Sequence, residues 1–111
     1  MDSLNNYQEI IEKVLNDFAD FLGNDDNVQS ELVFDRTRDR YLLVETGWEG
    51  IQRIYGLLLH LDIINGKIWI QHDGTESGIA YELVAHNVPK EHIVLGFKSL
   101  QRRQITEFAV S

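Results

Sequence analysis

The sequence predicts an α+β fold, in which a four-stranded antiparallel meander carries a long N-terminal helix and a second helix on one face. Three observations lead to this prediction. Asn65-Gly66 separates two runs of β-forming residues, as in a type I′ hairpin turn. Residues 4–22 have apolar side chains at helical spacing, and a shorter helical pattern follows at 76–86. The length of 111 residues predicts a single domain over 1–111.

The N-terminal helix is predicted from an apolar stripe with alternating steps of three and four residues. The stripe consists of Leu4, Tyr7, Ile11, Val14, Phe18 and Phe21. Ser3 fits the N-cap, and Gly23 fits the left-handed position after the last turn. The sheet needs a cover on one face, so the stripe is expected to belong to the hydrophobic core.

The strands are predicted at 28–35, 40–48, 51–64 and from Lys67 onward. With Asn65-Gly66 as a two-residue turn, Asp62 lies opposite Trp69, and His60 lies opposite Gln71. One face then collects the core residues Leu57, Leu59, Leu61, Ile63, Ile68 and Ile70. The other collects Gly56, Leu58, His60, Asp62, Trp69, Gln71 and Asp73. A tight turn at Glu49-Gly50 would add Leu42 and Val44 to the core face, and Tyr41 and Leu43 to the other.

After Asp73 the strand pattern ends. Thr75 is predicted to cap a helix at 76–86, and 92–97 reads as a short fifth strand, parallel to the fourth if both share one sheet. In the last segment, 98–111, the apolar residues Ile105, Phe108 and Val110 predict docking onto the domain.

The charge argues against a chain that holds DNA by itself, because such affinity depends on cations that neutralise phosphates. Net charge is −8. Residues 1–31 contain eight acidic residues and one lysine, whereas residues 98–111 contain three basic residues and one acid. An acidic end and a basic tail fit a basic partner or self-association, although a solvated acidic helix face is the favoured explanation of the first. With no cysteine, no membrane-spanning run and no signal-peptide pattern, we expect a cytoplasmic protein.

His60 and Asp62, with Gln71 across from them, are the strongest candidates for chemistry. A carboxylate two residues from an imidazole on a strand can orient it as a general base, or both can bind a metal. One histidine and two acids leave a zinc site incomplete, and no catalytic motif accompanies them. A structural or interface role is therefore favoured, with no catalytic, cofactor-binding or metal-binding residue and no cofactor, and a small ligand-binding or enzymatic site remains the alternative.

The predicted interface is the sheet face opposite the helices. Its members mix apolar and polar side chains and are Leu58, His60, Asp62, Ile64, Trp69 and Gln71. Exposed apolar patches usually mark binding sites, so this face is expected to form a homodimer or to hold a different protein. Alternatively, the C-terminal tail covers the face through Ile105 and Phe108.

Several long phrases carry a family resemblance. Five segments of the sequence resemble the XisI family. They are KIWIQHDGTESGIAYELV, NVPKEHIVLGF, LVFDRTRDRYLLVETGW, RIYGLLLHLDI and RRQITEFAV. These are the fdxN element excision controlling factors of nitrogen-fixing filamentous cyanobacteria. The resemblance implies a non-catalytic role in programmed DNA rearrangement during heterocyst differentiation, with a XisH-like, nuclease-fold partner. It implies no catalytic residues.

Overall fold

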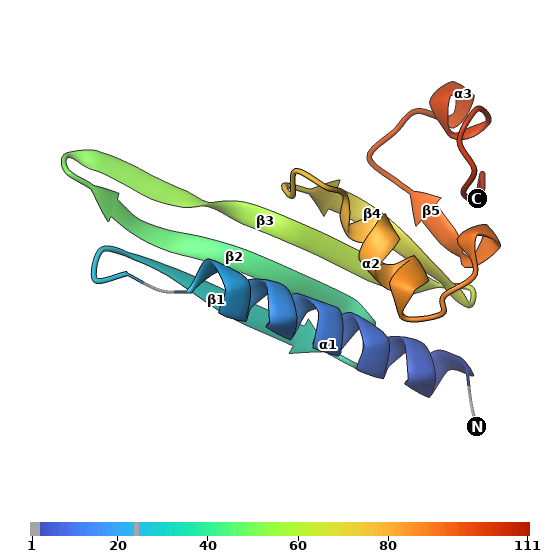
Figure 1. Cartoon of the computed structure of the whole chain (residues 1–111), viewed down its shortest axis with the longest axis horizontal. Helices are drawn as coiled ribbons and strands as arrows, with labels where there is room; N and C mark the ends of the chain where they lie inside the picture. The colour runs from blue at the N-terminus through green and yellow to red at the C-terminus, as the bar shows by residue number, and fades with distance from the viewer. Residues whose placement is uncertain (1–2, 24) are drawn as a thin grey trace.

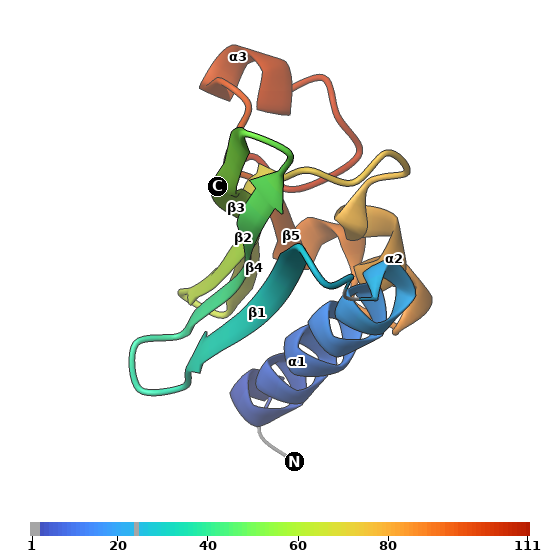
Figure 2. The same ribbon diagram turned by 90° about the vertical axis from the view of Figure 1, so that its left-hand side faces the viewer.

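The computed structural model describes residues 3–23 and 25–111, with side chains from residue 6 onward, and confirms the α+β class (Figure 1). The helices and strands are α1 (Ser3–Leu22), β1 (Val28–Asp35), β2 (Arg40–Glu49), β3 (Gln52–Ile64), β4 (Lys67–Asp73), α2 (Ile79–Ala85), a 3₁₀ turn (Lys90–His92), β5 (Ile93–Leu95) and α3 (Leu100–Arg103). The sheet order is β1-β2-β3-β4-β5, in which only β4 and β5 pair in parallel. Helices α1 and α2 cover the same face (Figure 2), and we call the opposite face of β1–β4 the outer face.

Helix α1 buries most of the predicted stripe. Tyr7, Ile11 and Val14 are buried against the sheet. Gly23 has φ +66° and its N–H bonds to the carbonyl of Ala19, so it ends the helix as predicted. Phe21 departs from the prediction, because it is 82% exposed at the end of the helix. The predicted cap Ser3 and the first stripe position Leu4 have side chains outside the described residues.

The turn between β3 and β4 has the predicted form. Asn65 and Gly66 have φ +51° and +77°, as a type I′ turn requires. Asp62 pairs with Trp69 as predicted. Four core residues of this hairpin are fully buried, namely Leu59, Leu61, Ile68 and Ile70.

A β-bulge changes the register farther along β4. The register shifts between His60 and Leu61, so His60 pairs with His72 instead of Gln71. The extra residue also moves Asp73 from the predicted outer face to the helix side, where it pairs with Leu59. The Asp73 carboxylate accepts hydrogen bonds from the Ile79 N–H at 2.9 Å and the Thr75 hydroxyl at 2.6 Å. Helix α2 therefore begins at Ile79, three residues later than predicted.

The β2–β3 hairpin differs more from the prediction. Its turn is Gly50-Ile51, with Gly50 at φ +62°, because glycine takes the first central position of a type II′ turn. Compared with the predicted turn, this turn pairs each residue of β2 with a residue of β3 two positions farther along. A shift of two residues leaves every side chain on its predicted face of the sheet. A second bulge does not preserve these faces: the register shifts between Leu43 and Val44, leaving Leu58 as an extra residue of β3.

This bulge reverses the faces of β2. Tyr41 and Leu43, predicted on the outer face, are fully buried opposite Leu61 and Leu59. The prediction of Leu42 and Val44 in the core is also wrong. Both alternate with the buried pair, and they lie on the outer face as half-buried side chains.

The C-terminal segment docks beside β5. The Ala109 N–H donates to the carbonyl of Ile93 at 2.8 Å, and Ala109 forms a parallel bridge with Val94. Phe108 is buried on the helix side, with its ring 5.8 Å from that of Tyr81. The prediction fails for Ile105, which is 87% exposed. No helix among the described residues is long and apolar enough to cross a membrane.

One ion pair fixes α1 to the turn between β1 and β2. Arg36 donates two hydrogen bonds of 2.7 Å to the carboxylate of Glu12, and these bonds hold the pKa of Glu12 below its ordinary value. A carboxyl whose pKa is lowered by folding stabilises the protein above its unfolded pKa, about 4.3 for glutamate. That contribution is lost as the pH falls through the lower, folded pKa.

Glu12→Gln is accordingly expected to lower the free energy of unfolding at pH 7, with a difference from the wild type that shrinks as the pH falls below about 4. Urea denaturation at pH 7 and at acidic pH measures this difference. A difference that does not change with pH would show that the ion pair does not contribute.

Candidate interaction surface

The outer face has a polar centre built around Asp62. Its side chain is only 6% exposed although α1 and α2 both lie on the other side of the sheet. His60 Nε2 donates to Asp62 Oδ1 at 2.8 Å, and the Gln71 amide donates to Oδ2 at 3.2 Å. Arg40 Nε lies 3.6 Å from Oδ1. The three candidate residues therefore do come together, because the Gln71 amide still reaches Asp62 from its position in the bulge.

This arrangement fixes the chemistry that the cluster can perform. Both carboxylate oxygens of Asp62 already accept hydrogen bonds, so the carboxylate serves to hold the His60 imidazole and the Arg40 guanidinium in place. Among the described residues, histidine and acidic side chains do not gather in groups of three or more that could hold a metal ion. The cluster is a fixed, partly desolvated group of hydrogen-bonding side chains on the outer face.

An apolar band adjoins the polar centre on the side of the β2–β3 turn. Leu42 pairs with His60, and Val44 pairs with Leu57, which is 37% exposed. On β1, Val33 lies beside Leu42 and is 45% exposed. A contiguous apolar area with a few polar neighbours is the composition of a protein interface core.

The hairpin tip extends this band with two aromatic side chains. Arg53 places its guanidinium 5.3 Å from the Trp48 ring centroid and 5.8 Å from that of Tyr55. All three lie on the outer face, since Trp48 pairs with Arg53 and Tyr55 follows two residues later. Tryptophan, tyrosine and arginine are the residues most enriched among energetically dominant interface positions. The sequence prediction missed this part of the surface, because the bulge at Leu58 reverses the faces of the hairpin tip and no local signal marks it.

The C-terminal segment reaches only one edge of the outer face. The guanidinium of Arg103 lies 5.4 Å from the Trp69 ring centroid and is held by the carbonyls of Lys98 and Val110. Ser111 accepts a 2.6 Å hydrogen bond from Lys67 Nζ beside Trp69. The predicted alternative, a cover made by Ile105 and Phe108, is not observed, because Ile105 is exposed and Phe108 packs beside Tyr81.

Five of the six residues predicted for the interface lie on the outer face. They are His60, Asp62, Ile64, Trp69 and Gln71. The placement of Leu58 on this face is wrong, because the bulge turns it toward the hydrophobic core, against which it packs. Its neighbour Leu57, predicted for the core, is exposed on the outer face instead.

Comparison with known proteins gives consistent matches over the whole chain. A model of the XisI family, described as XisI protein, matches residues 1–110. A XisI-like protein from Anabaena variabilis ATCC 29413 is 40% identical, with a TM-score of 0.92 over 97% of this chain and 99% of that chain. The fdxN element excision controlling factor XisI from the same organism is 36% identical, with a TM-score of 0.88 over 99% and 100% of the two chains. A search among curated proteins found no match.

Proposed function

Because the chain belongs to the XisI family, we propose that it is a cytoplasmic controlling factor in the programmed excision of a DNA element. In this proposal it catalyses no reaction itself and acts by binding a XisH-like protein of nuclease fold through the outer face. The observation that carries the proposal is the match over nearly the full chain to a solved protein named as an excision controlling factor. The name of that protein gives the proposed role, and the outer face gives the surface through which this chain would bind its partner.

The composition of the outer face supports a protein partner. Its apolar band is exposed at Val33, Leu57 and Tyr55, which favours burial against another surface. The partly desolvated Asp62 cluster adjoins this band, and fixed polar groups of this kind set the orientation of a bound partner. Binding energy would thus come from the apolar band and specificity from the polar centre.

The charge of the chain supports a complex in which the partner, and not this chain, contacts the DNA. A net charge of −8 repels the phosphate backbone. The partner, in this proposal, makes the DNA contacts, and the acidic chain restrains or directs it. We further propose that the free protein forms a homodimer.

Trp69→Ala is expected to weaken capture of the XisH-like partner by at least about tenfold, because a tryptophan that dominates an interface contributes about 2 kcal/mol or more and about 1.4 kcal/mol is a tenfold change. The measurement is co-purification of the two chains, followed by titration of the partner into the variant. A nuclease or excision assay with and without this chain then tests its control of the partner.

Phe21→Ala is the matched control for this experiment. Phe21 is an aromatic residue too, more exposed than Trp69, and it lies on α1, on the other side of the sheet. Phe21→Ala is expected to leave capture of the XisH-like partner unchanged. Equal capture by the Trp69 variant and the wild type would contradict the assignment of the outer face.

A further inference from the structure

Outside the outer face, a groove lies between the C-terminal half of α1 and the start of α2. Its volume is about 330 Å³, and its lining includes the apolar residues Val14, Phe18, Phe21 and Ile79 with the acidic residues Asp17 and Glu82. Phe21 is 82% exposed, and its ring centroid lies 6.3 Å from that of Phe18. Exposure of a large aromatic ring to water is unfavourable, so this groove has the apolar character of a binding surface.

The acidic rim specifies the charge of what the groove would bind. Asp17 is half exposed, and it forms an ion pair with Lys13 on the helix surface. Helix α1 contains four acidic residues, Glu9, Glu12, Asp17 and Asp20, against one lysine. The groove therefore favours an apolar segment flanked by lysine or arginine.

The chain carries a surface of that chemistry at its other end. We call it the C-terminal knob, and it comprises Phe97, Lys98, Leu100, Arg102 and Ile105. Its three apolar side chains are 47%, 51% and 87% exposed, in the order Phe97, Leu100 and Ile105. Lys98 Nζ lies 5.6 Å from the Phe97 ring centroid. The Arg102 side chain makes no hydrogen bond or ion pair within the part of the chain that the structure describes.

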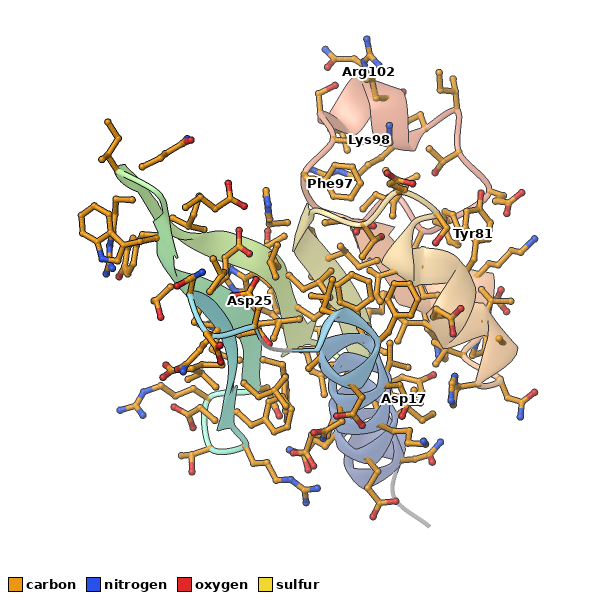
Figure 3. The ribbon with its side chains drawn as sticks, turned by 60° about the vertical axis from the view of Figure 1, so that its left-hand side comes forward. Asp17, Asp25, Tyr81, Phe97, Lys98 and Arg102 are labelled. Carbon is orange, nitrogen blue, oxygen red and sulfur yellow. The ribbon has the colours of Figure 1, made fainter. Side chains whose placement is uncertain are left out.

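The two surfaces lie apart within one chain. Figure 3 shows Phe97, Lys98 and Arg102 at the end of the molecule formed by α3, whereas Asp17 lies on α1 at the opposite end. The two surfaces have opposite charge, and both expose apolar side chains. Because they lie at opposite ends of one chain, they can meet only between two chains. We propose that the groove between α1 and α2 is a docking site for the C-terminal knob of a second copy of this chain.

This contact is separate from the outer face and does not rest on the XisH-like partner. It gives the homodimer a surface of its own and leaves the outer face of each copy open to the partner. Two reciprocal contacts between the same two copies close the assembly, whereas a single contact per pair extends it. In both arrangements the contact weakens as salt concentration rises, because it pairs exposed charges.

Charge exchange tests the proposal with the full chain. The groove variant is Asp17→Lys with Glu82→Lys, and the knob variant is Lys98→Glu with Arg102→Glu. Each variant alone places like charges across the contact and is expected to weaken self-association by about tenfold or more, as measured by sedimentation velocity. An equimolar mixture of the two is expected to restore association, because each contact in a mixed pair again joins opposite charges.

Two controls separate this contact from other causes. Unchanged melting temperatures of the variants exclude unfolding, and Leu57→Asp on the outer face is expected to leave self-association as in the wild type. Capture of the XisH-like partner by both charge variants should also remain. The proposal is overturned if the wild type is monomeric, if the charge variants associate as the wild type does, or if their mixture does not recover association.

Discussion

Leu57→Asp is expected to reduce capture of the XisH-like partner by about a hundredfold or more while the chain stays folded. Leu57 pairs with Val44 at the centre of the apolar band and is 37% exposed, so its replacement removes little from the core. In the complex, however, the new carboxylate would be buried in an apolar contact, which costs several kcal/mol. Isothermal titration with the partner measures the loss, and thermal unfolding of the free chain measures its stability.

The adjacent residue supplies the control. Leu58 packs against the hydrophobic core, so Leu58→Asp brings a charge toward apolar side chains and is expected to destabilise the free chain by about 2 kcal/mol or more. The same substitution at two neighbouring positions would thus impair partner binding at Leu57 and folding stability at Leu58. Equal loss of stability in both variants would contradict the position of the bulge.

Gly47→Ala is expected to be the most destabilising small substitution in the sheet. A Cβ atom at this position would lie 2.0 Å from the carbonyl oxygen of Asn27 and 2.6 Å from the Cα of Val28. Both are backbone atoms, so β1 would have to move away from β2 and strain the hydrogen bond from the Trp48 N–H to the Asn27 carbonyl. The cost is on the order of 3 kcal/mol, equivalent to a fall in melting temperature of roughly 10 °C or more.

Gly56→Ala is the matched control in the neighbouring strand. A Cβ atom there would meet nothing within 4 Å. Because alanine loses less backbone entropy on folding than glycine, this variant is expected to be as stable as the wild type or slightly more stable. A similar loss in both variants would show that the close approach of β1 to Gly47 is not the cause.

The sequence was sufficient for the parts of the fold that depend on local signals. Asn65-Gly66 determined the type I′ turn, and with it the placement of Asp62 opposite Trp69. The apolar stripe of α1 and the burial of Leu59 and Leu61 also followed from periodicity. These features rest on φ preferences and on a regular alternation, both of which are visible in a single sequence.

The two bulges could not be predicted in the same way. Each inserts one residue and so reverses the faces of everything beyond it. In the run Leu57-Leu58-Leu59 any of the three can face the core, so hydrophobicity does not show which is the extra residue. The late start of α2 follows from the bulge in β4, because it brings Asp73 to the helix side, where its carboxylate accepts a hydrogen bond from the Ile79 N–H. The polar cluster was predictable because both bulges leave His60, Asp62 and Gln71 on one face.

The docking of Ala109 beside β5 has a consequence for aggregation. A sheet with two free edges can add strands from other chains on both sides. Here the hydrogen bond from Ala109 to Ile93 occupies part of one edge with the protein's own backbone. The remaining edge is β1, where Glu31 on the outer face places a negative charge against an incoming strand. Loss of the last few residues would therefore open a short, buried hydrophobic strand to intermolecular pairing.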